Sequence, residues 1–262
     1  MKFGIFYNDQ QTDETNANRL AQFIRERGGE AFVFSRVTQI EGVDRLIVLG
    51  GDGTVLRVAK RASQIGIPLV GVNYGTLGFL AEFERGEEEK AAELVMSDCD
   101  VVRRSMLEVE LDGKKTYCLN ELALLHPVNE KQSNGVVKIS VEIDGSKAGN
   151  FIADGLIVAT PTGSTAYSLS AGGCVMTPDS QTFMLTPVCA FSLRSRPIVF
   201  PDSCTLTIAL SEDTLMLYGD GDYLGQVSGE HRLIIKKAER TALLLTADRN
   251  GYFRRLTQKI NH

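Results

Sequence analysis

The sequence predicts two domains, an α/β domain with a parallel sheet followed by a β-rich domain. Over the first hundred residues, apolar runs of strand length alternate with stretches whose apolar residues recur at helical spacing. Near residue 100 the long helical patterns end, and Asp-Gly turns flanked by alternating apolar residues replace them. The 262 residues suffice for two ordinary domains. We therefore expect domains at 1–98 and 99–248 and a tail at 249–262, a short helix or strand that packs back on the first domain.

The elements of the first domain follow from its apolar spacing. The first helix is expected to stop at Gly28, and the last one begins with acidic residues that suit a helix N-terminus. The run Leu46 to Leu49 is typical of a strand buried on both faces. We expect strands over residues 2–7, 30–34, 45–49 and 67–72, and helices over 13–27, 54–65 and 86–97.

The second domain is recognised by its turns. Residues 111–114 and 143–146 each hold an Asp-Gly pair between alternating apolar residues, which predicts a hairpin. Further strands are expected at about 118–125, 136–143, 155–160, 204–210, 214–218 and 231–236.

Composition excludes several kinds of protein. The net charge is −5 and no long Lys/Arg block occurs, so we expect no nucleic-acid partner. No apolar run approaches the roughly 20 residues of a membrane span, so we expect no membrane partner. The five cysteines form no Cys-x-x-Cys pair, which favours reduced thiols and a cytoplasmic protein. The three histidines lack metal-ligand spacing, and we expect no metal centre built by protein ligands alone.

The most informative segment is Gly50-Gly51-Asp52-Gly53-Thr54, which joins a buried strand to a helix. Glycines let the backbone approach a ligand closely, and the N–H groups of a helix start suit a phosphate. A carboxylate suits Mg²⁺ or a hydroxyl proton. A tight turn would use the same residues, but together the parts indicate phosphoryl transfer. Neither the dinucleotide-binding Gly-x-Gly-x-x-Gly after the first strand nor a Walker-type Gly-Lys-Ser/Thr is present.

Polar residues concentrate in four further segments. Individual hydroxyls such as Thr162 or Ser164 suit turns and caps, but the density of the third segment favours ligand binding because polar groups in apolar strands need partners. The segments are residues 71–80, 119–122, 153–170 and 219–222.

Together these segments resemble the NAD kinase family over nearly the whole chain. The matching motifs are Gly50 to Thr54, Gly75-Thr76-Leu77-Gly78-Phe79-Leu80, Asn120-Glu121, and Asp154-Gly155 with Thr160 to Ser168. The resemblance implies a Rossmann-like first domain, a sandwich-like second domain and a homodimer or homotetramer. It implies phosphorylation of NAD at the 2′-hydroxyl of its adenosine ribose to give NADP, with ATP or polyphosphate as donor and a divalent metal, Mg²⁺ or Mn²⁺.

The resemblance also assigns residues. Asp52 matches the essential carboxylate, which we expect to orient and deprotonate the hydroxyl. Asn120 and Glu121 resemble adenosine contacts, and Tyr167 is expected to stack on, or close over, a nucleotide ring. The remaining expected nucleotide-binding residues are Gly53, Arg57, Asp154, Thr165, Ala166, Ser168, Leu169, Ser170, Asp220 and Asp222.

Two positions depart from the family pattern. Ile152 stands where many members have Arg, and Asp222 stands where many have Gln. Two other functions stay open at this point: a lipid kinase of the diacylglycerol or sphingosine type, which shares the glycine turn, and a non-catalytic NAD(P)-binding sensor. The intact turn argues against the sensor, and the polar 160–170 run argues against the lipid kinase.

Overall fold

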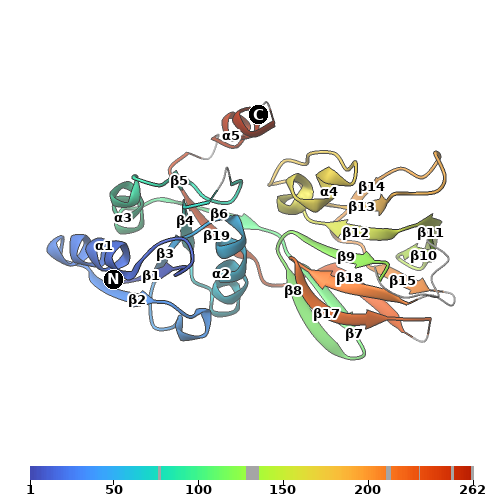
Figure 1. Cartoon of the computed structure of the whole chain (residues 1–262), viewed down its shortest axis with the longest axis horizontal. Helices are drawn as coiled ribbons and strands as arrows, with labels where there is room; N and C mark the ends of the chain where they lie inside the picture. The colour runs from blue at the N-terminus through green and yellow to red at the C-terminus, as the bar shows by residue number, and fades with distance from the viewer. Residues whose placement is uncertain (76–77, 128–135, 211–213, 230, 249–250, 261–262) are drawn as a thin grey trace. The chain divides into compact units, whose positions relative to one another are not determined.

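The computed structural model of the chain describes residues 1–75, 78–127, 136–210, 214–229, 231–248 and 251–260. It divides into two compact units, one of Met1–Arg104 with Thr241–His262 and one of Ser105–Arg240 (Figure 1). The division differs from the predicted boundaries at 98 and 248. The reason is that β6 (Asp100–Arg104) and β19 (Ala242–Thr246) pair with each other and belong to the sheet of the first unit.

The first unit is built on the parallel sheet that the sequence predicts. Its strand order is β2-β1-β3-β4-β19-β6, with β5 beside β4. Every neighbouring pair is parallel except β19 with β6. The five-residue run of β19 was not predicted as a strand; it lies beside β4, with Leu244 opposite Leu69. The other strands are β1 (Lys2–Tyr7), β2 (Glu30–Phe34), β3 (Arg45–Leu49), β4 (Leu69–Asn73) and β5 (Phe83–Glu84).

Helices cover this sheet. Helix α1 (Glu14–Glu26) is capped by Asp13, whose carboxylate accepts from the N–H of Asn16 at 3.0 Å. Helix α1 and helix α3 (Glu88–Met96) bury apolar side chains in one cluster against the strands. Helix α2 (Asp52–Ile65) contacts β3, β4 and β19 and ends at Gly66, whose φ is 71°. Because α2 begins at Asp52, two residues before the predicted start, the carboxylate itself lies in the first turn.

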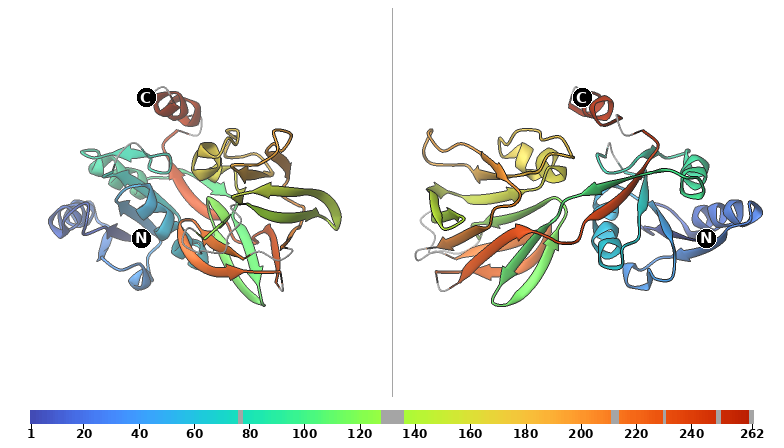
Figure 2. Two further views of the ribbon diagram at one scale, coloured as in Figure 1. Left: turned by 45° about the vertical axis from the view of Figure 1, so that its right-hand side comes forward. Right: turned by 180° about the vertical axis from the view of Figure 1, so that it is seen from behind.

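The second unit contains two six-stranded antiparallel sheets, with orders β11-β10-β15-β18-β7-β8 and β14-β13-β12-β9-β16-β17. Leu107 and Ile139 of the first sheet share one core with Leu156 and Phe183 of the second, so the unit is a sandwich (Figure 2). The strands are β7 (Leu107–Leu111), β8 (Lys114–Cys118), β9 (Glu121–Leu125), β10 (Val137–Ile143), β11 (Ser146–Ala153), β12 (Gly155–Ala159), β13 (Thr182–Val188), β14 (Ile198–Pro201), β15 (Leu206–Leu210), β16 (Leu215–Gly219), β17 (Asp222–Val227) and β18 (Arg232–Lys237).

Both predicted hairpin turns are present. At Asp112–Gly113 and Asp144–Gly145, both residues have positive φ, which matches the twist of a two-residue hairpin. A third turn of this kind, Asp220–Gly221, joins β16 to β17; the sequence analysis treated it only as part of the site.

The tail forms helix α5 (Gly251–Ile260) in the first unit. Within the described part of the chain, no helix is both long and apolar enough to cross a bilayer. Two short 3₁₀ helices, Val37–Gln39 and Thr162–Thr165, and the short helix α4 (Tyr167–Ser170) complete the elements.

Candidate active site

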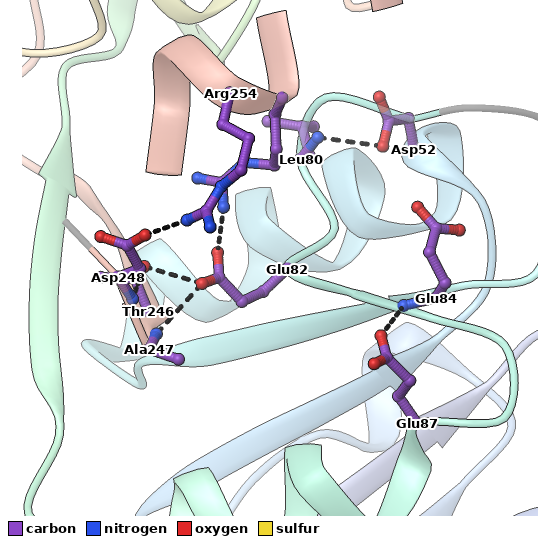
Figure 3. Close-up of polar contacts among 10 residues, drawn as sticks. Asp52, Leu80, Glu82, Glu84, Glu87, Thr246, Ala247, Asp248 and Arg254 are labelled. Carbon is purple, nitrogen blue, oxygen red and sulfur yellow. Dashed lines mark hydrogen bonds and ion pairs between the residues drawn. The ribbon is translucent and has the colours of Figure 1, made fainter. Parts of the chain in front are cut away.

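Asp52 is held at the start of α2 by a segment that follows β4. Its Oδ1 accepts a hydrogen bond from the N–H of Leu80 at 3.1 Å, and its Oδ2 accepts one from the N–H of Phe79 (Figure 3). A Cβ atom on Gly78 would overlap the carboxylate, so only glycine fits there. Each oxygen accepts one of these two bonds, so with respect to the described residues of this segment each has a lone pair for a further partner. The Gly75-to-Leu80 motif therefore orients Asp52 through its backbone; Thr76 and Leu77 lie outside the described residues.

The loop after β1 fixes the glycine turn, a role that the sequence analysis missed. Oε1 of Gln11 accepts from the N–H of Gly51 at 2.7 Å. Nδ2 of Asn8 donates to Oγ1 of Thr54 at 2.8 Å. Amides give no periodic signal in a sequence, so only the tertiary structure reveals these contacts.

Gly53 and Arg57 lie on the exposed side of α2. They are four residues apart, so they are neighbours on one helix face. A phosphate at the α2 start would therefore meet a cationic side chain one turn further on.

A half-buried tyrosine, Tyr74, lies directly before Gly75. Its hydroxyl donates to the carboxylate of Glu88, and burial raises the pKa of Tyr74 to about 12. Oδ1 of Asn73 accepts from the N–H of Gly75 at 3.0 Å. These contacts hold Asn73 to Gly75, the residues that lead into the segment bonded to Asp52.

In the second unit, Asn120 and Glu121, the first residue of β9, carry buried acceptor atoms. Glu121 is 8% exposed. Considering only described residues, neither Oδ1 of Asn120 nor Oε2 of Glu121 has a hydrogen-bond partner. Burial, and then the charge of Asp220, raise the pKa of Glu121 to about 7, while the backbone N–H of Tyr167 partly offsets them. Buried unpaired acceptors are uncommon in proteins and here suit a polar ligand.

Asp220 organises this turn. Its Oδ2 accepts from the N–H of Leu119 at 2.9 Å, and its Oδ1 accepts from those of Asn120 and Glu121 at 2.8 and 3.2 Å. The predicted site residue Asp220 thus contacts the backbone of two other site residues. This geometry fits a positioning role better than direct ligand contact.

In the hydroxyl-rich segment after β12, several hydroxyls bond to groups within the protein, whereas the sequence analysis expected the segment to bind a ligand. Oγ1 of Thr160 donates to the carbonyl of Leu119 at 2.5 Å and accepts from the N–H of Gly163 at 3.1 Å. Ser168, a predicted site residue, is fully buried and its hydroxyl pairs with Thr186 at 2.8 Å. We therefore interpret the Ser168 hydroxyl as support for the segment, because its bonding partner is internal.

The neighbouring residues of this segment lie nearer the surface. Tyr167 is 38% exposed, and partial burial, Cys189 and Glu121 raise the pKa of its phenol. Asp154 is half-buried beside β13, with its N–H bonded to the carbonyl of Val188 at 2.9 Å. Of the other predicted site residues, Thr165, Ala166 and Leu169 are half-buried, and Ser170 and Asp222 are exposed.

We call Asn120, Glu121, Tyr167 and Asp220 the Glu121 cluster. The structure brings these four residues together. Asp222 is the exposed first residue of β17. In the part of the chain that the structure describes, no group of three or more His, Cys, Asp or Glu side chains is arranged to hold a metal ion.

In the first unit, a carboxylate beside a glycine turn at a helix start is the arrangement expected of an enzyme that transfers a phosphoryl group. Comparison with known proteins gives the family. The ATP-NAD kinase N-terminal domain matches residues 7–99, and the ATP-NAD kinase C-terminal domain matches residues 119–247. The chain belongs to the NAD kinase family.

Individual relatives agree. The chain is 30% identical to an NAD kinase of Lachnoclostridium phytofermentans over 98% of both proteins. It is 38% identical to an NAD kinase of Bacteroides fragilis over 79% of both. The solved structure of an Archaeoglobus fulgidus NAD kinase in complex with ATP superposes with a TM-score of 0.83 at 26% identity, covering 100% of this chain and 99% of the other. The lipid-kinase and sensor alternatives are not favoured by these matches.

Proposed function

We propose that this chain catalyses phosphorylation of NAD at the 2′-hydroxyl of the adenosine ribose to give NADP, with Asp52 as the general base. The single observation that carries the mechanism is the fixed Asp52 carboxylate at the carboxyl end of β3, held by the N–H groups of Phe79 and Leu80. The ribose oxygen forms a bond to the terminal phosphorus of the donor while the bond from that phosphorus to its bridging oxygen breaks. The hydroxyl proton passes to Asp52.

Correct positioning of the reacting groups contributes much of the rate enhancement of phosphoryl transfer. Phosphoryl transfer needs an in-line arrangement and an acceptor for the proton. Correct placement can lower a barrier by roughly 7–11 kcal/mol, and a base typically adds about 10²–10⁴-fold. The backbone bonds to Asp52 support this account because they fix the base before substrate arrives.

ATP is the proposed donor, and its phosphates are proposed to bind at the glycine turn and the α2 start. Support comes from the related Archaeoglobus fulgidus NAD kinase, whose structure is a complex with ATP. Arg57, one turn beyond Gly53, is proposed to attract the donor charge. Polyphosphate would use the same N–H donors.

NAD is proposed to bind to the Glu121 cluster, with Asp154 and the segment 165–170 completing the contacts. The unpaired Oε2 of Glu121 and Oδ1 of Asn120 support this assignment, since both would accept from hydroxyl or amino groups of the nucleotide. Tyr167 offers a partly exposed ring for stacking.

A divalent metal, Mg²⁺ or Mn²⁺, is proposed to enter with the donor. The described residues build no three-ligand cage, but Mg²⁺ commonly binds through one carboxylate and the phosphates of a substrate. Asp52 fits as that carboxylate because each of its oxygens retains a lone pair. The metal would neutralise charge on the donor phosphates.

We also propose that the protein is a cytoplasmic homodimer or homotetramer. No disulfide joins any of the five cysteines, all of which lie among the described residues, and this suits a reducing compartment. Phe191 and Leu193, between β13 and β14, are 78% and 85% exposed, and such apolar exposure supports association. Sedimentation velocity would measure the oligomeric state.

One assay tests the proposed activity. Purified protein is incubated with NAD, ATP and Mg²⁺ or Mn²⁺, and NADP is measured with an NADP-specific dehydrogenase. NADP formation that requires NAD and a phosphoryl donor supports the proposal. Absence of NADP with ATP and with polyphosphate would overturn it, and parallel assays with diacylglycerol and sphingosine test the lipid-kinase alternative.

A further inference from the structure

The carboxylate of Glu82 accepts hydrogen bonds from three donors in the C-terminal part of the chain. Its Oε1 accepts from Oγ1 of Thr246 at 2.9 Å and from the N–H of Ala247 at 3.1 Å. Its Oε2 pairs with Nη1 of Arg255, on helix α5, at 3.0 Å. Figure 3 shows these contacts around the Glu82 carboxylate. The Glu82 side chain is only 10% exposed. Glu82 therefore ties the end of β19 and the helix α5 to the middle of the first unit.

Glu82 lies two residues after Leu80, whose N–H holds Asp52. The N–H of Glu82 bonds to the carbonyl of Gly71 at 3.1 Å, and the strand β5 that follows has only the residues Phe83 and Glu84, which pair with Val72 and Asn73 of β4. The side-chain contacts of Glu82 add a tie from this segment to residues 164 to 173 positions away in the sequence.

We propose that Glu82 and Arg255 are positioning residues for phosphoryl transfer, through which the C-terminal helix fixes the segment that orients Asp52. Neither residue touches the substrate in this account. The inference rests on the proposed function, because it concerns the orientation of the proposed base. It assigns a role to α5, which lies beyond the match to the C-terminal family domain at residues 119–247.

The Glu82 carboxylate is nearly buried. Without the Arg255 charge, it would keep two uncharged donors and lose its ionic partner, and the segment would move toward water to hydrate it. A displacement of the Phe79 and Leu80 N–H groups would turn the Asp52 carboxylate. A misplacement of about 1 Å can lower a rate by about 10²-fold.

Helix α5 offers a matched control. Arg254 precedes Arg255 and pairs with Asp248, an exposed partner, instead of Glu82. Arg254→Ala removes the same charge from the same helix. It leaves the Glu82 contacts in place.

The experiment compares wild type, Arg255→Ala, Arg255→Lys, Glu82→Gln and Arg254→Ala in the NADP assay. We expect Arg255→Ala and Glu82→Gln to lower kcat by about 10-fold or more with the KM values for NAD and ATP nearly unchanged. Arg255→Lys should recover part of kcat, and Arg254→Ala should match wild type. Amide hydrogen exchange of the peptide that carries Phe79 and Leu80 should be faster in Arg255→Ala.

Equal kcat in Arg255→Ala and wild type, or equal losses in the Arg255 and Arg254 variants, would overturn the inference. A lower Tm with unchanged kcat would also overturn it, because that result describes a purely structural contact. If the wild type makes no NADP, the proposed function fails, and the exchange comparison alone decides whether α5 fixes the segment. Unchanged exchange there would contradict the inference.

Discussion

Gly78 lies directly against the carboxylate of Asp52, so closely that a Cβ atom at position 78 would overlap Oδ1. The two residues are 26 positions apart in the sequence, and the contact exists because the segment after β4 returns past the start of α2. The next two N–H groups, of Phe79 and Leu80, bond to the same carboxylate. The glycine therefore permits the backbone to reach the proposed base.

The first prediction concerns this contact. Gly78→Ala should lower kcat by about 10-fold or more, because the new methyl group must displace the carboxylate or the segment. The melting temperature should fall modestly. Steady-state kinetics and calorimetry measure both, and a variant with normal kcat and normal Tm would show that the contact is loose in solution.

Asp220 should act on NAD binding through the turn that it holds. Asp220→Ala removes the acceptor of three N–H groups, and an unpaired buried group costs about 1–3 kcal/mol. We expect a lower stability and a raised KM for NAD, with a smaller change in kcat. Asp112→Ala is the control, since Asp112 occupies the same position of a hairpin turn and has a φ of 51° like Asp220. Equal effects of both substitutions on NAD binding would refute the positioning role.

The pH dependence of stability follows from Glu121. Its pKa is raised from the ordinary value of 4.5 to about 7 in the folded protein. The folded state thus binds the proton more tightly than the unfolded state, and this stabilisation is full below about pH 4.5 and is lost as the pH rises through about 7. Glu121→Gln should remove this contribution. Thermal unfolding of the two proteins from pH 5 to 8 should show a steeper decline for wild type; parallel curves would contradict the prediction.

Salt should affect the two substrates differently. The segment 153–170 contains no Lys or Arg, so NAD should be held mainly by hydrogen bonds of backbone N–H, hydroxyl and carboxylate groups and not by side-chain cations. Exposed charge pairs are screened over about 8–10 Å at moderate ionic strength, and ATP carries the greater charge. The KM for ATP should rise more steeply with salt than that for NAD, and less steeply in Arg57→Ala. An equally steep rise for NAD would indicate a cationic NAD contact that the described residues do not show.

The local features of the site could be predicted from the sequence, but the contacts between residues far apart in the chain could not. The β3 strand, the glycine turn and α2 follow one another along the chain, so spacing and turn chemistry predicted them. The partners of Asp52 and of Asp220 lie 27 and about 100 residues away, and no periodicity reports such contacts. Ser and Thr are ambiguous for another reason: the hydroxyls of Thr160 and Ser168 could bind a ligand or the backbone, and only the structure shows their internal partners. β19 was not predicted because the short run of four apolar residues, Ala242 to Leu245, lies near the end of a β-rich stretch and does not indicate which sheet it joins.

The central claim is that Asp52 removes the proton of the 2′-hydroxyl, and Asp52→Asn tests it most directly. The substitution preserves size, but it replaces one acceptor with an amide donor near the N–H groups of Phe79 and Leu80, so unfolding should be measured alongside kinetics. With the fold intact, we predict that kcat falls by at least about 10²-fold while the KM for NAD changes little. A folded Asp52→Asn protein with near-normal kcat would contradict the account.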